Sequence, residues 1–399
     1  MNTLKEILGL PGVKESFGKT VREDSPLSIS TDSRTIHSGQ SFLALEGAKF
    51  KPMKFLEQLE QAPVVFYEKN PFNDKLARQA RDKHFFVAVN DSVRFLQDIG
   101  SLAAKSFVSN GGKLIAIAGS NGKTTTKEML FHLLKSFEPE TVCTKKNNNN
   151  HIGVPLTLLQ IESKTKFCVL ELGSNHPEEI RFLCEISCPN IGVVTNIGDT
   201  HLEFFGSREE VFKEEGSLYE AIDNSSWASK LFFLNTDDQF LSQLPKKKHV
   251  IAYGKDDGND IQVNASFDHA LLRLEQGFEK TELCLLNDNI TGEHNFINLS
   301  VAFIMARRLL KRTSKDLLAK AQSFVPTSNR SEWIELKGTK VFLDAYNANP
   351  SSMKAALKAF RQKVLEAQSD LKDAGLILGD MNELGPKAKT YHEELGRHC

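Results

Sequence analysis

The fold of this chain is most constrained by residues 114–126, which read Leu-Ile-Ala-Ile-Ala-Gly-Ser-Asn-Gly-Lys-Thr-Thr-Thr. A short apolar run ends in a turn bounded by Gly119 and Gly122, and a helical pattern begins at Lys123. Such a turn cradles phosphate because glycines let backbone N–H groups approach the anion, while the helix dipole and the lysine charge attract it. The Thr124 hydroxyl stands where a threonine of this motif usually meets Mg²⁺.

The motif is shorter than the full phosphate-binding pattern, because Ile117 stands where the first glycine would be. The alternative is an ordinary glycine turn before a helix. The residues that follow are spaced to give one apolar helical face; they are Met129, Leu130, Leu133 and Leu134. This strand–turn–helix context favours the phosphate site.

The composition narrows the class of protein. A chain of 399 residues is too long for one core, and 25% charged with 40% hydrophobic residues is typical of a globular enzyme. The net charge of −1 argues against a nucleic-acid partner, and we interpret the lysines at 246–248 as a solvated loop. The sequence has no C-x-x-C pair, no signal-peptide core and no apolar stretch of membrane-spanning length. We expect a cytoplasmic, monomeric protein that binds no membrane.

The pattern of strands and helices predicts three α/β domains. Residues 1–90 form a small N-terminal domain, and 91–112 form a linker helix that ends at Asn-Gly-Gly. In residues 113–325, apolar strands alternate with helices, which predicts a largely parallel, doubly wound central sheet of the P-loop type.

Residues 326–399 form a third, Rossmann-like domain in this interpretation. A strand at 341–344 precedes a helix from about Ser352, and residues 376–380 repeat that design as a second strand. Because two strands are too few for a covered α/β sheet, we expect this domain to be incomplete at Cys399.

Polar residues at the carboxyl ends of the central strands are candidate ligands. Glu171 closes one strand, and His201 follows another. Glu215 lies on the apolar stripe of the next helix, where a carboxylate is costly unless it is paired or bound to metal. The alternative is that Glu215 lies at the edge of the stripe and reaches solvent. With Thr124, these three side chains would form a hard-ligand Mg²⁺ site, in which histidine is the least usual member.

Several polar clusters have two interpretations each. Asp-Ser-Arg at 32–34 could bind a nucleotide or cap a turn. The asparagine run at 147–150 is longer than one turn requires. Asn295 and Asn298 face inward at the start of a helix, where an amide could contact adenine or cap the helix.

Eight motifs, in this order, carry a resemblance to a known family. They are Thr-Asp-Ser-Arg at 31–34, Gly-Ser-Asn-Gly-Lys-Thr-Thr-Thr at 119–126, Asn-x-Asn-Asn-x-Ile-Gly-Val-Pro at 147–155, Glu-Leu-Gly-Ser-Asn-His-Pro at 171–177, Asn-Ile-Gly-Asp-Thr-His-Leu-Glu at 196–203, Gly-Glu-His-Asn-Phe-Ile-Asn at 292–298, Asp-Ala-Tyr-Asn-Ala-Asn-Pro at 344–350 and Leu-Gly-Asp-Met-Asn-Glu-Leu-Gly at 378–385. The chain resembles the ATP-dependent Mur ligases, and the last two motifs resemble the MurF group within them.

The resemblance implies a three-domain ligase that uses ATP and Mg²⁺. Its substrates would be UDP-MurNAc-tripeptide and D-Ala-D-Ala, joined through an acyl phosphate in peptidoglycan precursor synthesis. The implied nucleotide contacts are Gly119, Ser120, Asn121, Gly122, Lys123, Thr124, Thr125, Asn295, Asn298, Arg330 and Asp344. The implied substrate contacts are Ser33, Arg34, Asn149, Asn150, Ser174, Asn347 and Asn349. The implied metal ligands are Thr124, Glu171, His201 and Glu215, and the catalytic groups are Lys123, His201, Glu215 and Arg330.

The chain departs from the family pattern in two internal places. Glu215 stands where the family usually has a carbamylated lysine, and we expect its carboxylate to replace the carbamate. Lys-Pro-Met at 51–53 replaces a usual Asp-Gly-His near the uridine site. The family's C-terminal domain also continues beyond position 399. Two alternatives therefore stay open: a nucleotide-binding module without ligase activity, and another Mur-type or folylpolyglutamate-type ligase.

Overall fold

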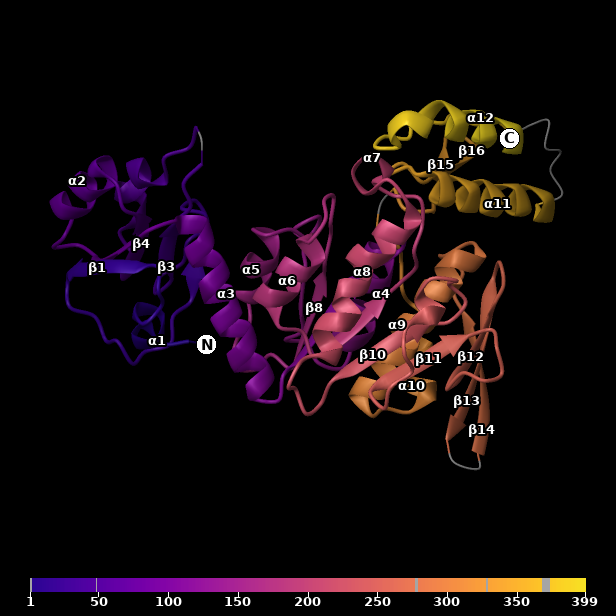
Figure 1. Ribbon diagram of the computed structural model, residues 1–399, viewed down its shortest axis with the longest axis horizontal. Coiled ribbons are helices and arrows are strands. Elements are labelled where there is room, and N and C mark those ends of the chain that lie inside the picture. The colour runs from indigo at the N-terminus through magenta and orange to yellow at the C-terminus, as the bar shows by residue number, and fades with distance from the viewer. Residues whose placement is uncertain (1, 48, 277–278, 328, 368–373) are drawn as a thin grey trace. The chain divides into compact units, whose positions relative to one another are not determined.

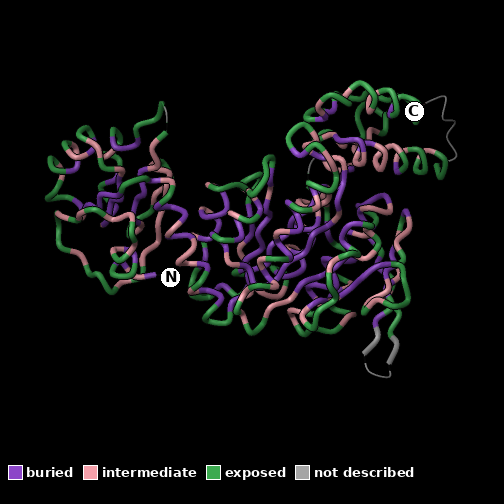
Figure 2. Tube along the Cα trace, in the orientation of Figure 1, coloured by how far each residue is buried: buried purple, intermediate pink, exposed green. Residues whose placement is uncertain are grey.

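The structure is a computed structural model, and it describes residues 2–47, 49–276, 279–327, 329–367 and 374–399. These residues fall into two compact units. The first comprises 1–114, 144–168 and 182–188, and the second comprises 115–143, 169–181 and 189–399. Figure 1 labels the elements, and Figure 2 shows that buried residues gather along the strands and their covering helices. Within the described ranges, no helix is both long and apolar enough to span a bilayer.

The N-terminal unit is built on a sheet in the order β1-β5-β4-β3-β2 (Figure 1). Its strands are β1 (Val13–Gly18), β2 (Ile29–Ser30), β3 (Ser41–Ala44), β4 (Val64–Glu68) and β5 (Phe85–Val89). Strands β2 to β5 pair in parallel, whereas β1 pairs antiparallel to β5. The strands at the centre are buried along their length, as expected for a parallel sheet covered on both faces. The predicted small α/β unit is present, although the sequence did not predict β1.

Helices cover this sheet and supply much of its core. They are α1 (Leu4–Leu8), the 3₁₀ segment η1 (Pro52–Leu59), α2 (Pro71–Gln79), α3 (Ser92–Ser109) and α5 (Gly153–Leu158). The predicted helix after residue 91 is therefore confirmed, and the Asp91 carboxylate caps it by accepting two backbone amides. Helix α3 packs on α5 so closely that a Cβ at Gly100 would lie 2.7 Å from Pro155 Cβ.

The central sheet has the strand order β14-β13-β12-β11-β10-β9-β6-β8-β7 (Figure 1). Its members are β6 (Lys113–Ala118), β7 (Val142–Cys143), β8 (Phe167–Glu171), β9 (Ile191–Val194), β10 (Leu231–Asn235), β11 (Val250–Gly254), β12 (Ile261–Ala265), β13 (His269–Gln276) and β14 (Glu279–Leu286). Strands β6, β9, β10, β11 and β12 pair in parallel, which confirms the predicted doubly wound α/β class. The antiparallel meander β12-β13-β14 was not predicted.

The helices of this region are α4 (Lys123–Lys135), α6 (Glu179–Ser187), α7 (Leu202–Phe205), α8 (Arg208–Asp223), α9 (Glu293–Leu310) and α10 (Ser314–Gln322), with a 3₁₀ turn η2 (Leu241–Gln243). Helix α4 packs on α9, and the predicted apolar face of α4 is fully buried. Helix α8 packs on β9, where a Cβ at Gly192 would lie 2.4 Å from Ile222 Cδ1. Close packing of helix on strand brings the carboxyl ends of β6 and β9 near α8.

The C-terminal residues contain an antiparallel pair, β15 (Glu332–Leu336) and β16 (Thr339–Leu343), followed by α11 (Pro350–Glu366), the 3₁₀ turn η4 (Gly385–Lys387) and α12 (Ala388–His398). The predicted strand at 341–344 and the helix near 352 are confirmed. The predicted strand at 376–380 is wrong, because that segment has no strand pairing and Ile377 is fully exposed. An apolar run becomes a strand only when a neighbouring strand accepts its backbone hydrogen bonds.

Candidate active site

The predicted phosphate cradle is present as a strand, a glycine turn and a helix. Strand β6 ends at Ala118, and Gly119 and Gly122 have φ of +118° and +80° before α4 begins at Lys123. A Cβ at Gly119 would lie 2.3 Å from Thr195 Oγ1, and one at Gly122 would lie 2.6 Å from Asn298 Oδ1. Both positions therefore require glycine for backbone conformation and for space.

Lys123 lies over this loop. Its Nζ donates to the carbonyl oxygens of Gly119 at 2.5 Å and Ser120 at 3.4 Å. The ammonium group is thus held at the mouth of the turn rather than in solvent. A phosphate bound to the turn would meet this positive charge directly.

Glu215 is inserted into the same place from α8. Its side chain is only 4% exposed, and Oε2 accepts the Gly119 N–H at 2.7 Å. Burial raises the pKa of this carboxyl, while the charges of Lys123 and His201 and the Gly119 hydrogen bond lower it. The alternative that Glu215 reaches solvent is wrong, because helix α8 packs its inward stripe against the strand ends.

Glu171 at the end of β8 is buried beside a lysine that the sequence analysis missed. Lys127 of α4 has no exposed surface, and its Nζ lies 2.9 Å from Glu128 Oε1 and 3.4 Å from Glu171 Oε2. The sequence did contain a signal for the burial of Lys127, because this residue precedes Leu130 and Leu134 at helical spacing on the apolar stripe. A buried ammonium needs such carboxylates close to it.

His201 caps the short helix α7 in a left-handed conformation, with φ of +52°. Its Nδ1 contacts the Glu383 carboxylate, and the Glu203 amide donates to the Glu383 carbonyl at 3.0 Å. Glu383 itself has φ of +61°. Glu383 belongs to the 378–385 motif, but no local pattern pairs it with His201, because 182 positions separate them.

The four predicted metal ligands are brought to neighbouring strand and helix ends, but not into one cluster. Within the described ranges, no group of three or more His, Cys, Asp or Glu side chains is close enough to hold a metal ion. Glu215 lies near Lys123 and His201, whereas Glu171 lies near Lys127. Carboxylate and hydroxyl oxygens are donors that suit Mg²⁺, so the chemistry of the set fits this ion.

The predicted inward orientation of Asn295 and Asn298 on α9 is confirmed. Both are buried, at 6% and 7% exposed. Asn295 Nδ2 donates to the Thr291 carbonyl at 2.9 Å, and Asn298 lies against Gly122 of the phosphate cradle. Contact of either amide with adenine stays a prediction.

Residues from the C-terminal part reach the cradle. Arg330 Nη2 donates to Thr124 Oγ1 at 3.1 Å, and the guanidinium stacks over the Tyr346 ring at 3.8 Å. Asp344 Oδ1 accepts the Ser331 amide at 3.1 Å, and burial raises the pKa of its carboxyl. Arg330 is therefore placed at the threonine predicted to meet the metal, while Asp344 supports the adjacent backbone.

The remaining candidates lie in three places. In the N-terminal unit, Arg34 pairs with the Asp32 carboxylate at 2.9 and 2.7 Å, and Asn150 Oδ1 accepts amides at the start of α5. Ser33 Oγ and the Gln58 side chain are 3.4 Å apart.

Asn149 is half-buried in the loop before α5, and Ser174, in the loop after β8, is buried. Asn347 is exposed, and its Oδ1 accepts the Ala348 amide. A substrate contact at any of these residues stays a prediction.

Asn349 is instead joined to the cradle. It is buried, caps α11, and its Nδ2 donates to Asn121 Oδ1 at 2.6 Å. Asn349 was predicted to contact the substrate and Asn121 the nucleotide, and the structure brings their side chains together.

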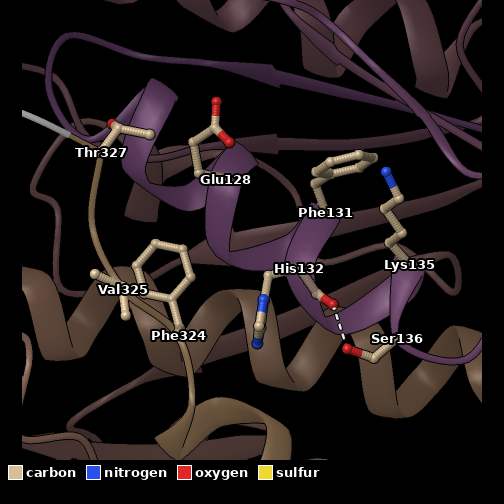
Figure 3. Close-up of a pocket in the computed structure, with 8 residues that line it drawn as sticks. All are labelled: Glu128, Phe131, His132, Lys135, Ser136, Phe324, Val325 and Thr327. Carbon is tan, nitrogen blue, oxygen red and sulfur yellow. Dashed lines mark hydrogen bonds between the residues drawn. The ribbon is translucent and has the colours of Figure 1, made fainter.

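A cavity of about 360 Å³ is lined by residues other than Lys123, Glu215 and Arg330 (Figure 3). It lies between α4, which contributes Phe131, His132 and Lys135, and the segment containing Phe324 and Val325. His132 Nε2 lies 3.0 Å from the Lys320 carbonyl and 3.1 Å from Ser323 Oγ, so its ring is engaged by the neighbouring turn. The phosphate cradle, rather than this cavity, is the candidate active site because the charged groups converge there.

Two family models match the chain. A Mur ligase middle domain matches residues 117–306, and a Mur ligase glutamate ligase domain matches residues 329–399. The chain is 32% identical over 372 residues to UDP-N-acetylmuramoyl-tripeptide–D-alanyl-D-alanine ligase of Bacillus subtilis, covering 92% of this chain and 76% of that protein. The chain belongs to the Mur ligase family. The Haemophilus influenzae enzyme of the same name is 30% identical, with 93% of this chain and 77% of that protein covered.

Solved Mur ligase structures agree with the fold. MurF from Acinetobacter baumannii superposes with a TM-score of 0.72 at 28% identity, covering 92% of this chain and 77% of that one. MurF from Thermotoga maritima, solved with ADP, also gives 0.72 at 25% identity, with 93% and 82% covered. These structures confirm the resemblance to the Mur ligases that the motifs indicated.

Proposed function

We propose that this chain is an ATP-dependent ligase that joins D-Ala-D-Ala to UDP-MurNAc-tripeptide, giving UDP-MurNAc-pentapeptide, ADP and phosphate. Two kinds of evidence support the proposal. The first is its relatives' names at 30–32% identity over nine-tenths of the chain. The second is the convergence of Lys123, Glu215 and Arg330 at the glycine turn and the first turn of α4; the three residues come from α4, from α8 and from the segment before β15. This convergence is the observation that carries the proposal.

The reaction begins with phosphoryl transfer. The terminal carboxylate of the tripeptide attacks the γ-phosphorus of ATP, the bond to the β-phosphate oxygen breaks, and an acyl phosphate and ADP result. Lys123 and Arg330 stand where they offset negative charge on the transferring group. In the second step the amine of D-Ala-D-Ala attacks the acyl carbon, loses a proton and expels phosphate.

Mg²⁺ fits the carboxylates of this site. Thr124, Glu171, His201 and Glu215 would hold it, and the ion would supply further positive charge to the phosphates. Glu215 stands where the Mur ligases usually carry a carbamylated lysine, and we propose that its carboxylate supplies the corresponding negative oxygen. Burial raises the pKa of this carboxyl, and the Lys123 charge and the Gly119 hydrogen bond act against that rise. A bound divalent cation would add further positive charge in favour of the carboxylate form.

The test is release of phosphate from ATP by this chain, with and without UDP-MurNAc-tripeptide and D-Ala-D-Ala. Release that needs both substrates, together with a new amide product identified by mass spectrometry, is the expected result. ATP binding without substrate-dependent release would instead support a nucleotide-binding module without ligase activity. That second candidate is favoured by one observation, the Lys-Pro-Met at 51–53 near the implied uridine site.

A further inference from the structure

Asn121 of the phosphate turn is bound through its side chain to the start of α11. Its Oδ1 accepts from Asn349 Nδ2 at 2.6 Å, and its Nδ2 donates to Ser351 Oγ at 2.9 Å. Ser351 Oγ in turn donates to Asn349 Oδ1 at 2.9 Å, which closes a ring of three side chains. We call these three residues the Asn121 junction. Asn121 lies in the matched middle domain, and its two partners lie in the matched C-terminal domain.

The backbone of Asn121 is held as firmly as its side chain. Its N–H donates to Asn196 Oδ1 at 3.2 Å, and its carbonyl accepts from Thr195 Oγ1 at 2.6 Å and Asn196 Nδ2 at 2.9 Å. Each polar group of Asn121 therefore has a partner. The residue sits between the phosphate turn, the end of β9 and the first turn of α11.

Gly198 lies against the Asn121 junction. A Cβ there would lie 3.0 Å from both Asn121 Nδ2 and Ser351 Oγ, and the Gly198 amide donates to Ser120 Oγ at 2.8 Å. The space allows the two polar atoms to meet, and a methyl group at Gly198 would require them to shift by a few tenths of an ångström. The contact therefore brings together three segments that are distant in sequence, around residues 120–122, 195–198 and 349–351.

We propose that Asn121 is a positioning residue, which anchors the phosphate turn to the start of α11 through Asn349 and Ser351 and so sets the strength of nucleotide binding. Asn121 is flanked by Ser120 and Gly122, so fixing it fixes the backbone that surrounds the phosphates. A preorganised loop binds more tightly because it loses less conformational freedom on binding. By reciprocity, nucleotide on the turn must strengthen the hold on α11 to the same degree. This inference rests on the proposed nucleotide site.

Adjacent serines of α11 provide a matched pair of variants. Ser351 touches Asn121, whereas Ser352 belongs to the capping box, where its hydroxyl bonds to the backbone of Asn349. Ser351→Ala should weaken binding of Mg–ADP by about fivefold in titration calorimetry, the effect of losing one neutral hydrogen bond. Ser351→Thr keeps the hydroxyl and should restore most of the affinity. Ser352→Ala should destabilise the cap while leaving the affinity within about twofold of wild type.

Hydrogen exchange of the amides in the first turn of α11 supplies a readout that a merely structural role would not move. Mg–ADP should slow exchange of these amides in the wild type and in Ser352→Ala, but much less in Ser351→Ala. Gly198→Ala, which inserts a methyl group without removing a polar atom, should act like Ser351→Ala.

Two results would overturn the inference: unchanged nucleotide affinity and unchanged ADP-dependent protection in Ser351→Ala, or equal effects of the two serine variants. Failure of the wild type to bind Mg–ADP at all is a separate outcome, and it would overturn the proposed function together with this inference.

Discussion

Lys127 carries a buried charge that depends on its neighbours. Its side chain has no exposed surface, and Glu128 and Glu171 lie 2.9 and 3.4 Å from its Nζ. Desolvation alone would lower its pKa, but the carboxylates of Glu171 and Glu128 keep the pKa above its usual value. The ammonium therefore stays charged in the interior and holds two carboxylates in place.

Removing that charge should lower the stability of the protein. Lys127→Met leaves Glu171 and Glu128 without the buried cation, and we expect a loss of about 3 kcal/mol in the free energy of unfolding. Urea unfolding followed by circular dichroism measures it. Lys135→Met on the same helix is the control, because Lys135 is exposed, and it should change stability by less than about 0.5 kcal/mol. Equal effects of the two variants would contradict the argument.

Glu215 should matter for metal dependence more than for folding. Glu215→Gln keeps the size of the side chain but removes the negative oxygen near Gly119 and Lys123. We expect the Mg²⁺ concentration for half-maximal turnover to rise by at least about tenfold. Glu210→Gln, at an exposed position of the same helix, serves as the control. Unchanged magnesium dependence in Glu215→Gln would show that the carboxylate does not replace the family's carbamate.

His294 links stability to pH. Burial lowers its pKa from 6.5 to about 4. Between these values the unfolded chain binds a proton that the folded chain does not, so stability is lost as the pH falls from 6.5 towards 4. His294→Gln should flatten the stability profile in this window, measured by urea unfolding at pH 4.5, 5.5 and 6.5. A profile as steep as that of the wild type would assign the pH dependence to other groups.

At the scale of elements, α8 contacts the phosphate turn and the start of α6 through adjacent carboxylates. Glu215 binds the phosphate turn, and Glu214 accepts the amides of Glu178 and Ile180, each at 2.7 Å, at the start of α6. Glu178 has φ of +71°, so this entry to the helix needs support. One helix thus sets the position of the phosphate turn and of the loop that follows Glu171.

Glu214→Ala should weaken this link. Two buried amides lose a charged acceptor, and we expect about 2 kcal/mol of destabilisation by urea unfolding. Faster hydrogen exchange at Ile180 would localise the effect to the start of α6. Glu210→Ala, which removes only an exposed pair with Lys213, should cost less than about 0.5 kcal/mol. A Glu214→Ala protein as stable as this control would disprove the link.

At the scale of the whole molecule, each unit has its own sheet. The N-terminal sheet buries apolar clusters on its two sides, around Phe66 and Phe95 and around Tyr67 and Phe86. The central sheet carries the phosphate turn. Units with separate cores unfold separately unless a large interface joins them.

Calorimetry should therefore resolve more than one unfolding transition. Mg–ADP should raise the midpoint temperature only of the transition that belongs to the central sheet. At about a hundred times the dissociation constant, the nucleotide adds roughly 2.7 kcal/mol to that transition. Lys123→Ala should abolish the shift while leaving the other transition unchanged. A single transition that moves as a whole with nucleotide would show that the units unfold cooperatively.

The sequence alone determined those features that depend on local order. The cradle followed from glycines and a lysine at fixed spacing, and the inward faces of Glu215, Asn295 and Asn298 followed from helical periodicity. The parallel sheet followed from alternating apolar strands and helices. These patterns are short-range, and the physics of turns, dipoles and burial interprets them directly.

The tertiary structure decided which distant residues meet. His201 with Glu383, Lys127 with Glu171, and Asn121 with Asn349 and Ser351 are separated by 44 to 230 positions. The apolar run at 376–378 has a sequence typical of a strand, yet it forms none because no neighbouring strand pairs with it in the described residues. Pairing and charge compensation depend on partners that lie far along the chain, and only the packed fold selects them.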